Sequence, residues 1–490
     1  LSYRQLHIMS GSSVNEGSPI PMLTIDRDRS SKPEGSKIYM DLQMYAQCCK
    51  HDVDSPDFAR FMDEEDPMKA YRERFHIPIN RNFRFVAPEL VALGDCCTYL
   101  CGNSLGLPAK ESLTMLEKVS SSWSHLGIYS QFEGEFSGVN CDGKCEKLLV
   151  PILGALEDEI SVMSSLTVNL HIAMTRFYRP NGVRCKILIE DHAFPSDIYM
   201  AKSQLGLHGL DESNLIQLKP DPETQLLSTQ IILDYLLDHG HEISVMLLPG
   251  VQYYTGQCLD MELITSIAHE RGIVMGWDLA HAVGNVPLHL HDWGVDFACW
   301  CSYKYLNSGP GGVGGLFIHE KHFNAPDLSI KGWWGNHIST RFSMKPDMEP
   351  APGASAMKIS TPPLHLIAIH YASLMLFHQA GMENIQRKQR LLTGYLEVLI
   401  RTYNEKTSCP KRVVSILTPE HPSERGAQLS LQFGVPASEV HSLLEKRGVI
   451  CDLRKPSVVR IAPVPFYNTF TDVYNFMLHL KHCLSSLASS

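Results

Sequence analysis

Two polar side chains in the middle of the chain stand directly after apolar runs, where a buried strand would end. Asp278 closes the run GIVMGWD, and His281 follows it three residues later. A buried carboxylate is costly unless a cation or a strong donor faces it. Lys304 follows the run DFACWC, and five glycines lie within 309–315. Glycine-rich backbone lets main-chain N–H groups approach a phosphate closely.

Together these residue types suit pyridoxal phosphate. An aspartate can pair with the pyridine nitrogen of that cofactor, a lysine can form a Schiff base with it, and a glycine-rich loop can approach its phosphate. Each feature alone has an ordinary explanation, because a lysine beside glycines is usually a surface residue and an aspartate at a strand end often caps a turn. Their order and spacing predict a pyridoxal phosphate enzyme. His281 can also be a hydrogen-bonded strand-end histidine without a catalytic role.

The elements that must position these residues alternate along the chain. Helices are predicted at 229–240 and 261–272. Strands are predicted at 160–166, 186–190, 244–250, 272–278, 296–301 and 314–319. Such alternation predicts an α/β fold with a mostly parallel sheet and helices on both faces. Ligands of such sheets bind at the carboxyl ends of the strands, which is where Asp278 and Lys304 fall.

Composition and periodicity divide the chain into four parts. Residues 1–55 are rich in Ser, Gly, Pro and charge and predict a mostly disordered extension. A helical segment at 56–98 is expected to join the small domain, and residues 99–365 form the large cofactor-binding domain. Residues 366–490 form the small α+β domain, which is expected to start with one long helix.

The overall composition excludes several classes of protein. The 490 residues carry 43 Lys and Arg against 53 Asp and Glu, so no basic excess exists to bind nucleic acid. Fourteen cysteines are too dilute for a disulfide scaffold and indicate reduced thiols in the cytoplasm. The longest uncharged stretch, 359–382, contains prolines and three histidines, which favours a buried helix over a membrane span. The HLH at 289–291 has no third ligand nearby, so no metal site is expected.

Several segments resemble kynureninases, and the resemblance covers about 56 to 485. The most specific is WGVDFACWCSYKYLN at 293–307, and the others include LCGNSLGL, SSLTVNLH, AFPSD, YTGQ and RIAPVPFYN. Kynureninases are fold type I pyridoxal phosphate enzymes, usually homodimers, that hydrolyse the Cβ–Cγ bond of L-kynurenine to anthranilate and L-alanine. They act in tryptophan catabolism and NAD precursor synthesis. The resemblance implies that fold, pyridoxal 5'-phosphate, a homodimer, and kynurenine or 3-hydroxykynurenine as the small amino-acid substrate.

The resemblance also implies a role for individual residues. Lys304 would form the Schiff base and move the proton at Cα, and Asp278 would keep the pyridine nitrogen protonated. Tyr303 would donate a proton, Arg460 would clamp the substrate carboxylate bidentately, and Gln131 would face the substrate. The further cofactor-binding residues implied by the resemblance are Leu166, Thr167, Phe194, Pro195, Ser196, Asp197, His281, Trp333 and Thr361.

Four positions depart from the family pattern. Pro249 replaces a serine, Gln131 replaces a histidine, Thr361 replaces an asparagine, and 136–138 replaces Arg-Pro-Trp. The hydroxyl lost at Pro249 would contact the cofactor, and the other changed positions would read the aryl ring of the substrate. The main cofactor anchors, such as Lys304 and Asp278, are kept. Three explanations stay open: a retuned substrate pocket, a weak relative that acts as a binding protein, and drift in a loop region.

Overall fold

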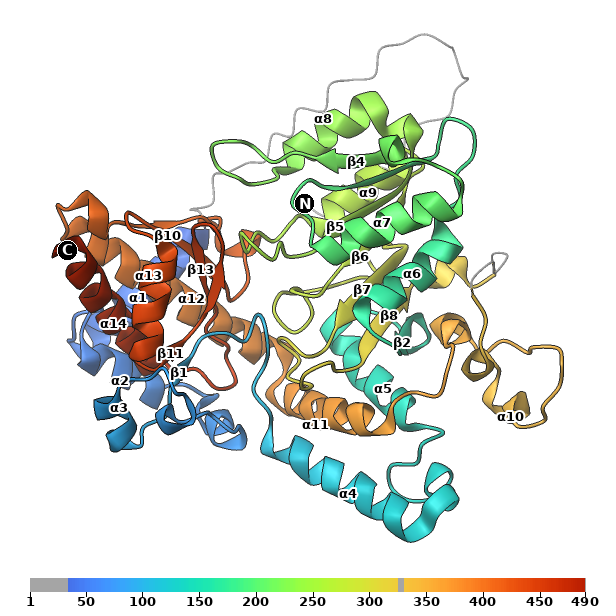
Figure 1. The fold of residues 1–490 in the computed structure, drawn as a ribbon, viewed down its shortest axis with the longest axis horizontal. Helices are drawn as coiled ribbons and strands as arrows, with labels where there is room; N and C mark the ends of the chain where they lie inside the picture. Colours follow the sequence, from blue (N-terminus) through green and yellow to red (C-terminus); the bar gives the residue numbers. More distant parts are fainter. Residues whose placement is uncertain (1–33, 325–329, 490) are drawn as a thin grey trace. The chain divides into compact units, whose positions relative to one another are not determined.

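The computed structural model describes residues 34–324 and 330–489, and its largest element is a seven-stranded sheet (Figure 1). The strands lie in the order β2 (Ile160–Val162), β8 (Gly314–Ile318), β7 (Phe297–Cys301), β6 (Val274–Asp278), β5 (Ile243–Pro249), β3 (Lys186–Glu190) and β4 (Leu215–Leu218). Strand β8 is antiparallel to both of its neighbours, β2 and β7, and all the other pairs of neighbouring strands are parallel. The predicted mostly parallel sheet is therefore confirmed. Strand β4 was not predicted, because LIQL is half-exposed and forms no continuous apolar run.

Helices cover both faces of this sheet because successive strand side chains point to opposite sides. On β7, Phe297 and Cys299 pack in one apolar cluster with α6 (Leu166–Phe177) and α7 (Pro195–Leu207). Ala298 and Trp300 pack on the other face, against a cluster that includes α5 (Cys141–Leu153), α8 (Thr229–His239), α9 (Met261–Glu270) and α11 (Leu364–Ala380). Gly315 is required beside Trp300, since a Cβ there would lie 2.1 Å from the indole ring.

A second, antiparallel sheet forms the small domain. Its strands lie in the order β12 (Asp452–Arg454), β13 (Val458–Ile461), β10 (Leu429–Phe433) and β9 (Val414–Ile416). Its core includes apolar residues of α12 (Met382–Glu405), α13 (Ala437–Lys446) and α14 (Phe470–Ser489). Helix α2 (Pro56–Glu64) packs on α14, and β1 (Thr98–Tyr99) pairs with β11 (Val449–Ile450), so amino-terminal residues complete this domain.

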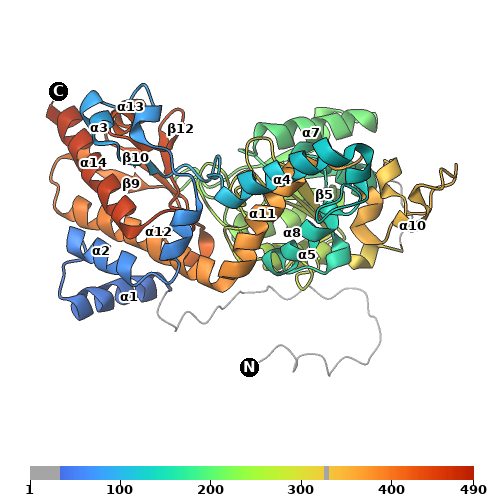
Figure 2. The same cartoon turned by 90° about the horizontal axis from the view of Figure 1, so that it is seen from below.

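The long helix expected at the start of the small domain is instead two helices. Gly381 separates α11 from α12 and has a φ of 74°, a left-handed conformation that favours glycine. Helix α11 packs against α5 and α4 (Lys110–Leu126), and Figures 1 and 2 both show α4 beside α11. Its apolar residues belong to the core of the large domain. We therefore propose a domain boundary at Gly381 rather than at 366.

Part of the expected disordered extension is helical. Residues Glu34–Cys49 form α1, and Leu42 and Ala46 are buried in the core of the small domain. The helix can approach α12 because Gly394 has no side chain, and a Cβ there would lie 2.5 Å from Ile38. The disorder prediction is thus wrong for 34–49, and residues 1–33 lie outside the described part. No helix in that described part has the length and apolar character needed to cross a membrane.

Candidate active site

The carboxyl ends of the parallel strands bring the chemical groups to one edge of the large sheet. Strands β3, β5, β6 and β7 run in the same direction, so their last residues lie at the same edge. Asp278 ends β6 and is in register with Pro249 on β5 and Cys299 on β7. Lys304 follows β7 in the turn beyond the same edge.

Asp278 is a buried acid that lies against a second buried acid, Asp197, whose Oδ1 has no hydrogen-bond partner among the described residues. Its Oδ1 accepts a hydrogen bond from the Ala280 N–H at 2.8 Å, and a hydrogen bond also couples it to Asp197. Burial raises the pKa of Asp278, while the positive charge of Lys304 opposes that shift. Burial, and next the charge of Asp278, raise the pKa of Asp197 well above its usual range. We read the pair as one proton on Asp197 and one negative charge on Asp278.

Glu190 adds a third buried carboxyl group to this edge. It ends β3, and its Oε1 accepts a hydrogen bond from Gln252 Nε2 at 3.1 Å. Burial raises the pKa of Glu190 to about 7, and the charge of Asp278 adds to the shift. Glu190 closes the apolar run KILIE just as Asp278 closes GIVMGWD, so the position of Glu190 at a strand end is a sequence signal that could have identified it.

Lys304 and His281 border the same acids. Lys304 is half-buried, with its Nζ 5.8 Å from the ring centre of Tyr303. A Cβ on Gly106 would lie 2.3 Å from the Lys304 carbonyl oxygen, so the loop 101–107 can close over this turn only with glycine there. His281 is buried, and its Nδ1 has no hydrogen-bond partner in the described structure. Burial, and next the charge of Lys304, lower its pKa well below the usual value, so its ring is neutral.

Two helix N-termini meet where a phosphate would bind. Thr167 lies in the first turn of α6 and Ser196 in the first turn of α7, and their hydroxyl oxygens are 2.7 Å apart. Ser165, at the N-cap of α6, makes no side-chain cap, so the first amide groups of that helix are available to an anion. Phe194 precedes α7 with a 44% exposed ring, whose edge meets Tyr253 with ring centres 5.5 Å apart.

These features fit pyridoxal phosphate. The buried carboxylate of Asp278 calls for a cation, which a protonated pyridine nitrogen supplies. The uncapped α6 terminus suits the phosphate, and the exposed Phe194 ring can stack on the cofactor. Lys304 lies close enough to Asp278 for the two charges to interact. A single pyridoxal ring could therefore contact Asp278 at its nitrogen and Lys304 at its aldehyde carbon.

Arg460 lies on the small domain and is almost completely buried. Its Nη1 donates to the Tyr253 carbonyl oxygen at 2.6 Å, and its Nη2 donates to Ser104 Oγ at 2.8 Å and to Asp452 Oδ2 at 2.5 Å. Its Nε is buried and makes no hydrogen bond with any described residue. Three of the five N–H groups of the guanidinium are therefore held by protein groups, which leaves Nε–H and one Nη1–H for a ligand.

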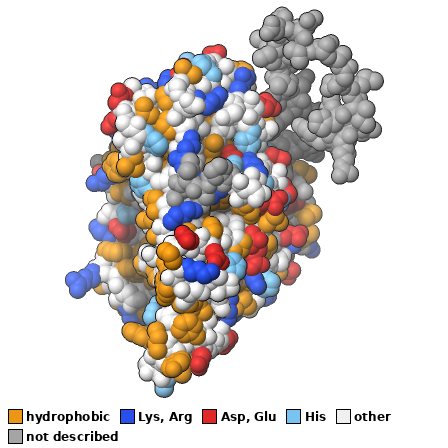
Figure 3. Space-filling view, turned by 90° about the vertical axis from the view of Figure 1, so that its right-hand side faces the viewer, with side chains coloured by type: hydrophobic (Ala, Val, Ile, Leu, Met, Phe, Trp, Pro, Cys, Tyr) orange, Lys and Arg blue, Asp and Glu red, His pale blue; other side chains and the backbone are white. Residues whose placement is uncertain are grey.

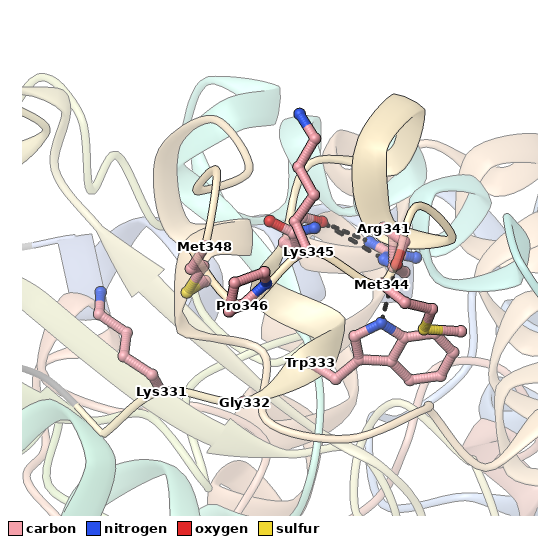
Figure 4. A pocket seen from close by; sticks show the side chains of 9 residues that line it. Lys331, Gly332, Trp333, Arg341, Met344, Lys345, Pro346 and Met348 are labelled. Carbon is pink, nitrogen blue, oxygen red and sulfur yellow. Dashed lines mark hydrogen bonds between the residues drawn. The ribbon is translucent and has the colours of Figure 1, made fainter.

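Three residues that the resemblance assigned to the site make no hydrogen bond or ring contact with Lys304 or Arg460 in the described structure. Gln131 ends the short helix at 127–131, Trp333 begins another at 333–335, and Thr361 is exposed. The Trp333 indole N–H donates to the Arg341 carbonyl oxygen at 3.0 Å and borders a cavity of about 350 Å³ (Figure 4).

The expectation that the HLH segment lacks a third ligand-type residue nearby is wrong. Glu159, His291 and His319 place one potential ligand atom each within 4.8 Å of one another. The sequence could not show this, because the three residues lie on separate elements. Each is already hydrogen-bonded: His291 Nδ1 lies 3.0 Å from Glu159 Oε1, which also accepts from the Glu320 N–H, and the Lys321 N–H donates to His319 Nδ1. These hydrogen bonds join Glu159, which precedes β2, to His291 and to Glu320, which follows β8.

Fold and site together define a fold type I pyridoxal phosphate enzyme. Solved structures with this fold include a C-DES mutant with glycine linked to its cofactor (TM-score 0.66, 17% identity, 80% of this chain and 96% of that chain). Another is a cysteine desulfurase from Escherichia coli (TM-score 0.64, 15% identity, 86% and 98%). At these identities the likeness establishes the fold alone.

Sequence relatives identify the family. The kynureninase C-terminal domain model matches residues 385–480. The human kynureninase is 46% identical over 87% of this chain and 93% of its own length, and the mouse kynureninase is 45% identical over 87% and 92%. The kynureninase of Myxococcus xanthus is 42% identical over 87% and 97%. The chain therefore belongs to the kynureninase family. The predicted family, fold class, enzyme class and cofactor are confirmed, and nothing in these comparisons supports the alternatives of a changed substrate or a binding protein.

Proposed function

We propose that this chain hydrolyses the Cβ–Cγ bond of L-kynurenine, and of 3-hydroxykynurenine, to an anthranilate and L-alanine. The observation that carries the proposal is the edge of the large sheet where the charge of Lys304 acts on Asp278, and where His281 lies within electrostatic reach of both Lys304 and Arg460 of the small domain. A substrate amino acid bound there would place its carboxylate toward Arg460. Pyridoxal phosphate supplies an electron sink for the bond-breaking steps.

Each residue of this chain has a defined task in that reaction. Asp278, kept charged by the proton on Asp197, holds the pyridine nitrogen in its cationic form. The Lys304 amine takes and returns the proton at Cα. Tyr303 stays a phenol at neutral pH because burial raises its pKa, so it can donate a proton. Arg460 orients the carboxylate with a charge-assisted hydrogen bond from Nε.

Turnover of kynurenine by the purified, cofactor-loaded protein tests the proposal, with anthranilate fluorescence as the readout. We expect turnover in the wild type and a rise in KM of roughly 10-fold or more in Arg460→Gln, because a charge-assisted hydrogen bond is lost. Leu237→Glu, on the exposed face of α8, is the control and should behave as wild type. A cofactor-loaded wild type that produces no anthranilate would refute the proposal.

We also propose that the active unit is a homodimer. An exposed apolar surface, called here the aromatic surface, consists of Ile128, Tyr129, Phe132, Trp333, Phe342 and Met344. Phe342 joins its two halves, with its ring centre 5.5 Å from those of both Phe132 and Trp333. Figure 3 shows hydrophobic side chains gathered toward the lower end of the face that presents α10 (Ile338–Arg341). A second copy on this surface would cover it and bring Gln131 and Trp333 to the partner's cofactor site.

A complementation experiment tests the shared site. Lys304→Ala and Trp333→Ala should each be inactive or weak alone, and mixing and exchanging subunits should restore turnover because one of the two sites then has both residues. Phe132→Glu should shift the sedimentation coefficient to that of a monomer, whereas Leu237→Glu, of similar exposure, should not. Mixed variants that stay inactive would contradict the shared site.

Because all fourteen cysteines, each in the described part, have free thiols, we place the enzyme in the cytoplasm.

A further inference from the structure

The contacts around Arg460 include a second acid and a second arginine that the proposed reaction does not use. Asp452 on β12 is the direct cross-strand neighbour of Arg460 on β13. Its Oδ2 accepts from Arg460 Nη2 and from the Ser104 hydroxyl, and Arg454 Nε lies 2.9 Å from its Oδ1. These four residues are called the carboxylate clamp. The Tyr253 carbonyl oxygen holds the remaining Nη of Arg460.

The charges in the carboxylate clamp leave one net positive charge. The Asp452 side chain is only 13% exposed, yet the two arginines and the Ser104 hydroxyl overcome burial and lower its pKa, so it is ionised. Two guanidinium groups and one carboxylate therefore sum to +1. The Arg460 side chain is 1% exposed, and its Nε–H is the buried donor left without a partner among the described residues. One net positive charge, with Nε–H and one Nη1–H of Arg460 unused by the protein contacts, matches a single carboxylate.

We infer that Asp452 and Arg454 are positioning residues that set the orientation and net charge of Arg460 and so make this subsite selective for a monoanionic carboxylate. Without Asp452, Arg460 Nη2 keeps only the Ser104 hydroxyl, and the planar guanidinium can turn its Nε away from the ligand. Without Arg454, the clamp has no net charge, and the Asp452 carboxylate opposes an incoming anion. This inference rests on the proposed role of Arg460 in carboxylate binding.

The test separates anion recognition from folding by using two competitive inhibitors of the holoenzyme that differ in charge. The first inhibitor, 4-(2-aminophenyl)-4-oxobutanoate, keeps the aryl ketone and the carboxylate of kynurenine but lacks its α-amine. The second inhibitor is the corresponding carboxamide, which is neutral at the position of the carboxylate. In Asp452→Asn and in Arg454→Gln, the inhibition constant of the acid should rise roughly 10- to 100-fold, while that of the amide changes less than about threefold. The affinity for pyridoxal phosphate, measured by absorbance titration, should stay at the wild-type value.

A matched control exists in the same domain. Glu397 has a 12% exposed side chain and pairs with the buried Arg425, so Glu397→Gln removes an ion pair of similar burial. We expect this variant to keep the wild-type ratio of the two inhibition constants. Arg454 is 35% exposed, so Arg454→Gln decides the question if Asp452→Asn does not fold.

Four outcomes would overturn the inference. Equal weakening of acid and amide would show a structural role only, and tighter binding of the acid by Asp452→Asn would show that Asp452 opposes the ligand. Arg460→Gln separates this inference from the proposed function. If Arg460→Gln abolishes the preference for the acid while the other two variants keep it, only the inference about Asp452 and Arg454 is wrong. If Arg460→Gln keeps the preference, the proposed role of Arg460 is wrong as well.

Discussion

Glu190 makes stability depend on pH in a direction that can be worked out from its surroundings. Burial at the end of β3 raises the pKa of its carboxyl from an ordinary 4.5 to about 7. Below pH 4.5 the carboxyl is protonated in both the folded and the unfolded chain. As pH rises from 4.5 to 7 the unfolded chain ionises first, so the free energy of unfolding falls. Above pH 7 both states are ionised, and the full penalty of about 3 kcal/mol is present, since each tenfold change in an acid constant corresponds to about 1.4 kcal/mol.

Glu190→Gln should remove this penalty, because the amide stays neutral and its oxygen can still accept from Gln252 Nε2. We expect the variant to gain up to about 3 kcal/mol over wild type between pH 5 and pH 8 in the cofactor-free protein. Urea denaturation at several pH values measures the difference, and the cofactor is left out because its cationic ring would change the local field. The charge of Asp278 contributes to the raised pKa of Glu190, so the gain in unfolding free energy need not add to the effects of other substitutions at this edge.

Glu270→Gln provides the control, because Glu270 is an exposed glutamate at the end of α9. The stability difference between this variant and wild type should not depend on pH. Our reasoning fails if the difference between Glu190→Gln and wild type stays flat from pH 5 to pH 8. It also fails if that difference changes with the opposite sign, which would mean that Glu190 is charged in the folded protein at low pH.

The remaining predictions concern the cofactor and the substrate ring. Lys304→Ala should lose turnover and the visible absorbance of the bound cofactor; the assignment would be contradicted if this variant still showed the wild-type absorbance and lost it on borohydride treatment. Asp278→Asn should fold but lose about a hundredfold or more in kcat, because one preorganised charge is gone; a loss below about fivefold in steady-state assays would count against it. Gln131→His with Thr361→Asn should raise kcat/KM for kynurenine or 3-hydroxykynurenine about tenfold, since a buried polar match to the ring shifts selectivity by roughly 1–3 kcal/mol. A wild type already as efficient as the double variant would mean that these substitutions are drift.

Local pattern was sufficient for the elements that carry the cofactor site. The runs KILIE, GIVMGWD and DFACWC are continuous and apolar because their strands are covered on both faces, and they became β3, β6 and β7. The chemical positions followed directly, because the carboxyl ends of parallel strands share one edge. Asp278 and Lys304 could be chosen for that reason. Glu190 met the same criterion and was overlooked.

The sequence pattern predicted one helix in place of α11 and α12, because the apolar residues of both follow the same helical period. The apolar spacing continues through 364–400, and only the left-handed backbone at Gly381 shows that the chain leaves one core and enters the other. Helix α1 was missed for a related reason. Its own sequence is too polar to predict burial, and it is stabilised by contact with a helix that lies more than 300 residues later.

The sequence by itself determined the fold class, the family and the cofactor chemistry, because these depend on residue types at the ends of strands and on motifs within short segments. Only the tertiary structure decided the setting of Arg460. Ser104, Tyr253 and Asp452 are brought to its guanidinium from three separate elements. Asp452 is only 8 residues from Arg460, but the contacts with Tyr253 and Ser104 span 207 and 356 residues of chain. The free energy that selects these distant contacts comes from burying two cores and one charge network. No local period or motif records such an arrangement, since it exists only once those surfaces are packed together.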